Sequence, residues 1–186
     1  MEQLNLIKKR KSIRAYKNDT VSEKDIHTLL EAARWAPSAG NKQPVEIVIV
    51  KSVEQKEKLM EGAYGQKFIG QVPVVFVICA NLDRSSARYG ERGATLYAIQ
   101  DAAAATQNIL LAAHGMDLGA VWLGVYPREN RLKRIAKLLG LPKELIPISI
   151  VSVGIPAEQK EIKDRFKTER IHLNSWSNKV DNGKRG

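Results

Sequence analysis

The sequence predicts one domain of the α/β or α+β class. Its 186 residues are the length of a single ordinary domain and are enough to bury a core. Hydrophobic residues make up 44% of the chain and charged residues 27%, a balance that excludes disordered, collagen-like and disulfide-scaffolded proteins. Runs of β-branched residues alternate with stretches of helical periodicity, and this alternation predicts the mixed class.

A first helix is predicted over residues 22–34. Apolar residues such as Ile26 and Leu29 recur on one face, which is the pattern of an amphipathic helix. Ser22 is followed three residues later by Asp25, and this pair gives a start similar to a capping box. A proline shortly after the last residue ends the helix, because the residue before a proline is pushed out of the helical region.

Four runs rich in β-branched and apolar residues are predicted to be strands. They are residues 45–50, 73–79, 120–125 and 148–153. The second run is apolar on both faces, and this places it in the interior of the sheet.

Three further helices are predicted between these strands. Residues 53–62 form a short polar helix, and residues 128–139 form a basic amphipathic helix followed by Gly140. Residues 95–114 form a long helix that Gly115 closes as a C-cap. The long helix is apolar around most of its circumference, so we expect it to be buried on several sides and to support association with a second chain.

Residues 1–176 are predicted to form the one domain, and residues 177–186 to be a frayed C-terminal tail. The longest apolar run, residues 72–80, is far shorter than the ~20 residues that a membrane helix needs. A basic run, residues 8–11, precedes any apolar stretch that could form a signal peptide, and the single cysteine cannot form an internal disulfide. We therefore expect a cytoplasmic protein with no membrane partner.

The charge of the chain favours an anionic partner. Thirty Lys and Arg residues stand against 20 Asp and Glu, a net charge of +10, which suits nucleic acid, an acidic membrane or a small phosphorylated ligand. The densest basic segment is residues 8–14, which also contains the hydroxyl of Ser12. Arginine, a hydroxyl and a second cation are good donors for one phosphate dianion, although solvated surface runs share this composition.

The loop over residues 36–44 carries a second group of candidate ligand-binding side chains. Ser38, Asn41 and Gln43 have the polar groups that bind the edges of heterocycles. Ligand contacts concentrate on loops that a rigid scaffold carries, and the alternative is a plain connecting loop rich in Pro, Gly and Asn.

Two shorter segments complete the candidates. In residues 118–124, Trp122 is interpreted as a large core side chain, while Gly124 lets a backbone amide approach a ligand closely. Residues 163–165 place two cations one residue apart in an irregular segment, which on its own is typical of a solvated charge cluster.

Several common sites are excluded by their missing motifs. The sequence has neither a P-loop nor a Gly-x-Gly-x-x-Gly fingerprint after a strand. Its three histidines, His27, His114 and His172, stand far apart, so we expect no metal site. Cys79 lies within a predicted strand and is interpreted as an inert core residue. An enzyme without these groups needs a cofactor that carries the reaction.

Five segments taken together resemble the FMN-dependent nitroreductase family. They occur in the family's order and spacing between residues 10 and 176, and they are residues 10–14, 36–44, 119–124, 152–156 and 163–165. The resemblance implies an α+β, three-layer nitroreductase-like fold in which helices flank a central mixed, mainly antiparallel sheet. It also implies a homodimer that holds FMN at the subunit interface and passes electrons from NADH or NADPH to nitro compounds, quinones or flavins.

The resemblance implies which residues hold the phosphate end of FMN. Arg10, Lys11 and Ser12 match the family's leading basic segment, which holds the phosphate and the ribityl chain. Lys163 and Arg165 match the C-terminal cations that close on the phosphate.

The resemblance also implies contacts with the flavin ring. Arg14 matches a basic position that reaches the pyrimidine edge, and Gln66 matches an amide that reads the ring edge. The loop that the partner subunit lays against the flavin is matched by Pro37, Ser38, Ala39 and Asn41. The segment beside the ring, where the backbone approaches N5, is matched by Trp122, Leu123 and Gly124.

The implied chemistry needs no catalytic side chain, and none is assigned. Donor and acceptor would use one face of the flavin in turn, which is a ping-pong mechanism, while the protein supplies positioning and charge. The competing hypothesis is a basic nucleic-acid-binding domain. Aromatic residues make up only 6% of the chain and no stacking platform is visible, so we expect no nucleic-acid partner. A relative that keeps the fold but has lost FMN is a third alternative, which the intact set of cations disfavours.

Overall fold

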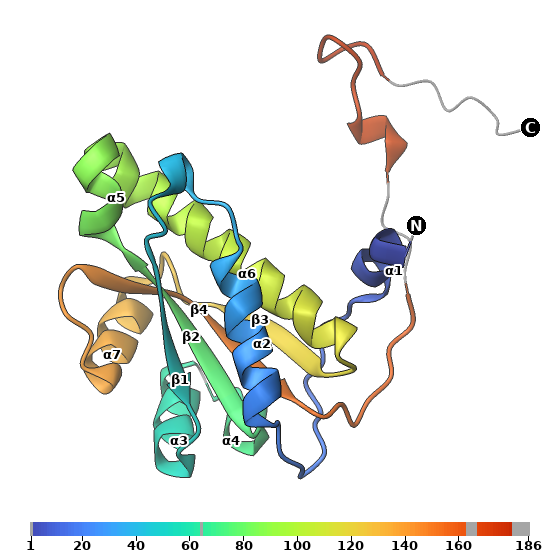
Figure 1. Cartoon of the computed structure of the whole chain (residues 1–186), viewed down its shortest axis with the longest axis vertical. Coiled ribbons are helices and arrows are strands. Elements are labelled where there is room, and N and C mark those ends of the chain that lie inside the picture. Colours follow the sequence, from blue (N-terminus) through green and yellow to red (C-terminus); the bar gives the residue numbers. More distant parts are fainter. Residues whose placement is uncertain (1, 64, 163–166, 180–186) are drawn as a thin grey trace, which may run out of the picture.

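The computed structural model describes residues 2–63, 65–162 and 167–179. Figure 1 shows the order of the elements along the chain. The α-helices are α1 (Glu2–Lys9), α2 (Glu23–Arg34), α3 (Val53–Gly62), α4 (Phe68–Gln71), α5 (Leu82–Tyr89), α6 (Ala98–Gly115) and α7 (Glu129–Leu139). The strands are β1 (Val45–Val50), β2 (Val74–Asn81), β3 (Gly119–Gly124) and β4 (Leu145–Gly154). Short helical turns are η1 (Ala39–Asn41), η2 (Gly93–Tyr97) and η3 (Thr168–Arg170).

The four strands form one sheet in the order β1-β2-β4-β3, and each neighbouring pair is antiparallel. An isolated parallel bridge joins Ser12 to Ala120 beside β3. Pro147 lies in β4 opposite Cys79, where the register between β2 and β4 shifts. A proline cannot donate to the ladder, so it is tolerated at such an irregularity.

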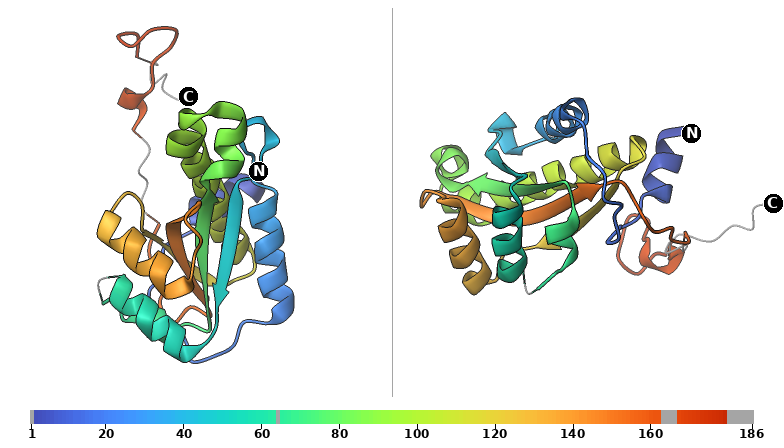
Figure 2. Two further views of the ribbon diagram at one scale, coloured as in Figure 1. Left: turned by 90° about the vertical axis from the view of Figure 1, so that its left-hand side faces the viewer. Right: turned by 90° about the horizontal axis from the view of Figure 1, so that it is seen from below.

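Helices cover both faces of the sheet and give the molecule three layers (Figure 2). Side chains of β2 alternate between the faces, with Phe76 packing toward α2 and α6 and Val75 toward α3, α4 and α7. Leu29 of α2 and Leu59 of α3 are fully buried in these two core clusters. The predicted three-layer α+β fold with a mainly antiparallel sheet is confirmed, and β2 lies inside the sheet as its apolar sequence predicted.

Most predicted element ends agree with the structure. The Asp25 N–H donates to the Ser22 Oγ at the start of α2 (N to O 3.0 Å), so the predicted cap is confirmed. Gly140 ends α7 with a left-handed φ of 62°. The prediction that Gly115 caps the long helix is wrong, because α6 includes Gly115 and the left-handed residue is Asp117 (φ 57°). Helices α1, α4 and α5 have no counterpart among the elements predicted from the sequence.

Helix α6 is the longest helix of its layer and runs from the end of the molecule near α5 to the end near α1. It packs against α2 and against all four strands, as its apolar sequence predicted. Its N-terminal end lies beside α5, and its C-terminal end lies beside α1 (Figure 1). From Asp101 to His114 the helix rises about 20 Å, at 1.5 Å per residue. Side chains at the two ends are therefore too far apart to touch.

No helix within residues 2–63, 65–162 and 167–179 is both long and apolar enough to cross a membrane.

Candidate functional site

The basic segment that follows α1 lines a cavity of about 470 Å³. The structure brings together the four predicted residues of this segment and adds one further cation from the segment after β4. These cavity residues are Arg10, Lys11, Ser12, Arg14 and Lys160. The Arg10 Nη1 atom is buried and has no hydrogen-bond partner among the described residues. Several cations, a hydroxyl and an unsatisfied guanidinium nitrogen form a donor set that suits a phosphate dianion.

The edge of the sheet fixes the backbone of this segment. The Ile13 N–H donates to the Ala120 carbonyl (3.0 Å), and the Ile13 side chain is buried at 8% exposure. A Cβ at Gly119 would lie 2.8 Å from the Ile13 Cγ2, so glycine is what allows this close packing. With Ile13 turned inward, its neighbours Ser12 and Arg14 line the cavity.

Glu158 and Lys160 hold the same segment from the other side. The Glu158 Oε1 accepts the N–H groups of Arg14 (2.5 Å) and Ala15 (3.2 Å), and the Lys160 Nζ lies 3.1 Å from it. The Lys160 ammonium also donates to the Ser12 carbonyl (2.7 Å). The Arg14 amide is the main cause of a pKa of Glu158 below the ordinary glutamate value. We call this pair the Glu158–Lys160 bracket.

Sequence reasoning missed the Glu158–Lys160 bracket. Lys160 is 148 residues away from Ser12, and Glu158 is 144 residues away from Arg14. The segment after β4 has no recognised pattern, and only its place before the cations at 163–165 could have drawn attention to it.

The loop with Pro37, Ser38, Ala39 and Asn41 lies at the opposite end of α6. The Ala39 N–H donates to the Asp101 Oδ1 (3.1 Å), and the Gln43 N–H donates to the Ser38 Oγ (2.8 Å). Pro37, Ser38 and Asp101 line a separate cavity of about 260 Å³ between this loop, α2 and β1. Asp101, which sequence reasoning also missed, is a carboxylate in a largely apolar stretch of α6.

The other predicted site residues have different outcomes. Gln66 is half-buried in the turn before α4, next to Phe68, whose ring lies 6.5 Å from that of Tyr16. Lys163 and Arg165 lie outside the described residues.

The segment predicted beside the flavin ring is the end of β3. Trp122 and Leu123 are half-buried and pack on opposite faces of the sheet, so Trp122 is a core side chain in part. Gly124 is exposed, and no described atom lies within 4 Å of where its Cβ would be. The chain's own packing therefore leaves room at Gly124 for another molecule.

One chain does not bring the two halves of the predicted site together. The Ala39 N–H donates to the N-terminal part of α6, whereas Arg10 and Lys11 lie near His114, close to its C-terminal end. Burial lowers the pKa of the His114 imidazole, and the nearby positive charges of Arg10 and Lys11 lower it further. The rise of the helix separates these ends by about 20 Å. A site that uses both halves would have to span this distance within one chain or combine two copies of the chain.

Comparisons with known proteins identify the chain. The family model described as "Nitroreductase family" matches residues 7–67 and 60–155. A protein of Archaeoglobus fulgidus, named for a proposed NADH dehydrogenase/NAD(P)H nitroreductase activity, is 40% identical over 94% of this chain and 99% of its own length. The chain belongs to the nitroreductase family.

Further nitroreductase-family relatives carry names that mention a flavin. "FMN reductase [NAD(P)H]" of Bacillus subtilis is 30% identical over 87% of this chain and 69% of its own length. The solved structure of "FMN-dependent Nitroreductase" from Clostridium difficile superposes with a TM-score of 0.82 at 27% identity, over 92% of this chain and 99% of that one. The resemblance to the FMN-dependent nitroreductase family is thus confirmed.

Proposed function

We propose that this nitroreductase is an FMN-dependent oxidoreductase that passes electrons from NADH or NADPH to nitroaromatic, quinone or flavin acceptors. The observation that carries the proposal is the cavity between α1 and the segment after β4. The Arg10 Nη1, which is buried and has no hydrogen-bond partner within the described part of the chain, provides donors for the FMN phosphate together with Lys11, Ser12 and Lys160. Names that mention FMN among relatives of 27–30% identity support the same cofactor.

The protein's own residues would bind and orient the cofactor. FMN, when bound, supplies the chemistry by accepting two electrons from the nicotinamide and passing them to the acceptor. Arg10, Lys11 and Ser12, with the predicted cations Lys163 and Arg165, would hold the phosphate end. Arg14 would place positive charge at the pyrimidine edge, and the open space at Gly124 would leave room beside the ring.

The functional unit is proposed to be a homodimer. The loop at Ala39 and the cavity at Arg10 lie at opposite ends of α6. A twofold axis that packs two α6 helices antiparallel would bring the loop of one subunit beside the cavity of the other. The outward face of α6 suits such packing, because small and apolar residues recur there at helical spacing and are only half-buried. These residues are Ala103, Ala104 and Leu111, and the half-buried polar side chain of Gln107 lies among them.

The proposed activity is tested on the purified protein. We expect a yellow protein with close to one noncovalent FMN per chain, which mild denaturation releases. Initial rates with NADH or NADPH should give parallel double-reciprocal lines at different acceptor concentrations, because donor and acceptor occupy one face in turn. A colourless protein that does not bind added FMN would contradict the assignment of FMN as the cofactor. Intersecting lines would contradict the ping-pong mechanism.

The dimer is tested separately by light scattering. We expect twice the mass of one 20.7 kDa chain at micromolar concentration. Because each site would use a loop from the neighbouring subunit, FMN binding and dimerisation should be lost together on dilution. A stable monomer that keeps its FMN would contradict the shared site.

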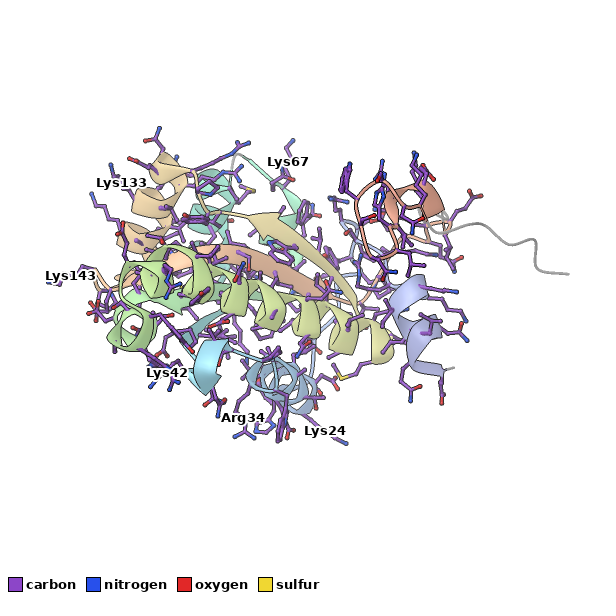
Figure 3. All side chains as sticks on the ribbon, turned by 90° about the horizontal axis from the view of Figure 1, so that it is seen from above. Lys24, Arg34, Lys42, Lys67, Lys133 and Lys143 are labelled. Carbon is purple, nitrogen blue, oxygen red and sulfur yellow. The ribbon has the colours of Figure 1, made fainter. Side chains whose placement is uncertain are left out.

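A nucleic-acid-binding function is less well supported by the distribution of charge. Figure 3 labels cations on both sides of the sheet, with Lys24 and Arg34 on α2 and Lys133 on α7. Binding to a nucleic-acid backbone favours a continuous basic stripe on one face. The absence of a nucleic-acid partner stays a prediction from the sequence. The cytoplasmic location is a separate prediction from the sequence, and the distribution of charge does not test it.

A further inference from the structure

The loop from Ser38 to Gln43 is held in an unusual backbone conformation. Gly40, Asn41 and Gln43 have φ angles of 54°, 55° and 49°. Two of these three residues are not glycine, and residues that carry a side chain rarely adopt the left-handed backbone conformation. Such strain persists only where the surrounding structure fixes the backbone, and it is concentrated at functional sites.

Three hydrogen bonds that involve side chains hold this loop, in addition to the backbone bonds within its short turn η1. The Gln43 N–H donates to the Ser38 Oγ within the loop (2.8 Å), and the Arg84 Nη1 of α5 donates to the Gln43 carbonyl (2.9 Å). The third bond runs from the Ala39 N–H to the Asp101 Oδ1 (3.1 Å). Of the groups that hold the loop, Asp101 is the buried one, at 7% exposure, and it belongs to the helix that spans the molecule.

Burying the Asp101 carboxyl group reduces folding stability by more than one hydrogen bond to a backbone amide recovers. Its second oxygen, Oδ2, is buried and has no hydrogen-bond partner among the described residues. Burial raises the pKa of this carboxyl group, and the bond from Ala39 opposes that effect only in part. A buried carboxylate with one satisfied oxygen destabilises a fold compared with a fully paired polar group. A gain in folding stability therefore does not explain an aspartate at position 101. The need for an acceptor that holds the Ala39 N–H does explain it.

We infer that Asp101 is a positioning residue, which fixes the Ala39 amide and so holds the strained loop in the shape that contacts FMN in the neighbouring subunit. The inference rests on the proposed function, because the loop is proposed to close the site of the partner chain. This bond joins the loop to the N-terminal end of α6, which is the helix proposed to form the dimer contact. Asp101 does not touch the cofactor in this scheme, and it acts through the backbone of Ala39.

Two substitutions separate the acceptor from the charge. Asp101→Ala removes the acceptor, whereas Asp101→Asn keeps an oxygen at Ala39 and removes the charge. Asn108→Ala is the matched control, because the Asn108 Nδ2 of the same helix donates to the Ala32 carbonyl of α2 (3.0 Å), away from the loop. If Asp101→Ala does not fold, Asp101→Leu fills the same space without an acceptor and takes its place.

The first measurement is hydrogen exchange of the peptide covering residues 37–43 in FMN-free protein. Asp101→Ala should increase exchange in this peptide, and Asp101→Asn and Asn108→Ala should leave it close to wild type. This result does not depend on FMN. Unchanged exchange in Asp101→Ala would overturn the anchor, whatever the outcome for the proposed cofactor.

The second measurement is the dissociation constant for FMN, obtained by titrating each protein and following flavin fluorescence. Asp101→Ala should raise it about tenfold, and Asp101→Asn should stay within about twofold of wild type. Equal losses in Asp101→Ala and Asn108→Ala would assign the effect to general stability and overturn the inference. Equal losses in Asp101→Ala and Asp101→Asn would also overturn it, in favour of a role for the charge. A wild-type protein that binds no FMN would overturn the proposed function and, with it, the cofactor-positioning role.

Discussion

Replacing Glu158 by glutamine is expected to raise the dissociation constant for FMN about tenfold, or ~1.4 kcal/mol, while bound FMN keeps its midpoint potential. Glu158 accepts the N–H groups of Arg14 and Ala15 and pairs with Lys160, which donates to the Ser12 carbonyl. A neutral amide cannot form the ion pair with Lys160, and it weakens both backbone bonds to the same oxygen. The segment that lines the cavity would then be ordered less firmly before FMN binds. Glu158 depends on its charge more than Asp101 does, because Asp101 accepts one backbone bond and has no ion pair among the described residues.

The control for this substitution is Glu161→Gln. Glu161 lines the cavity of about 470 Å³ and is also a glutamate, but it is not part of the Glu158–Lys160 bracket. Fluorescence titration of the FMN-free proteins with FMN should show a loss confined to Glu158→Gln. Equal losses of FMN affinity in both variants would assign the effect to the electrostatic field in the cavity. The proposed role of the Glu158–Lys160 bracket would then be wrong.

The same residue gives a pH dependence whose sign is fixed. The pKa of Glu158 is lower in the folded protein than the ordinary value of about 4.3, chiefly because of the Arg14 amide. Its contribution to stability is therefore fully present above that ordinary value, and it is lost as the pH falls through the lower pKa of the folded state. Thermal unfolding of FMN-free wild type and Glu158→Gln between pH 3 and 7 should show a difference that shrinks at the acid end.

The sheet and the main helices could be predicted because their signals are local. The start of α2 depends on Ser22 and Asp25, three residues apart, and β2 is apolar on both faces because both faces are covered. Helix α5 was not predicted, although it has a local signal of the same kind. The Arg84 N–H donates to the Asn81 Oδ1 at the start of this helix (2.9 Å). The helix is short and largely polar, with Ser85 as its buried residue, so its few apolar residues give little indication of a buried face.

A glycine near the end of a helical stretch can serve as a left-handed C-cap or can allow close packing inside the helix. The prediction that Gly115 caps α6 failed because the sequence does not distinguish these two roles. The predicted role of Gly115 was a left-handed C-cap, but the structure uses it inside α6, where a Cβ would lie 3.4 Å from the Leu6 Cδ1 of α1. Asp117 adopts the left-handed conformation instead, and aspartate is among the residues that tolerate it.

The candidate site was predictable where a motif names its residues, and the residues that support it were not. Arg10 and Ser12 belong to a contiguous basic segment whose composition indicates a phosphate. Glu158 and Asp101 act through backbone amides that lie 144 and 62 residues away in the sequence. A single sequence contains no signal for such pairs, except that a lone carboxylate in an apolar helix is unusual enough to notice.

Replacing Arg14 by leucine is expected to lower the midpoint potential of bound FMN by roughly 30–60 mV. Arg14 lines the cavity and is exposed, and its backbone is fixed by Glu158. If its guanidinium reaches the pyrimidine edge, as the family position implies, it stabilises the negative charge that reduction adds there. A hydrogen bond to a charged group is worth ~1.5–3 kcal/mol, and 30 mV corresponds to ~1.4 kcal/mol for a two-electron couple.

The matched variant is Arg165→Leu, at a predicted phosphate contact outside the described residues. Because a phosphate keeps its charge when the flavin is reduced, this variant should release FMN and leave the potential of the remaining holoenzyme nearly unchanged. Arg14→Leu should do the reverse and retain oxidised FMN with a modest loss of affinity. Redox titration of both variants against a dye of known potential separates holding the cofactor from tuning it. An unshifted potential in Arg14→Leu would make Arg14 an ordinary solvated surface charge.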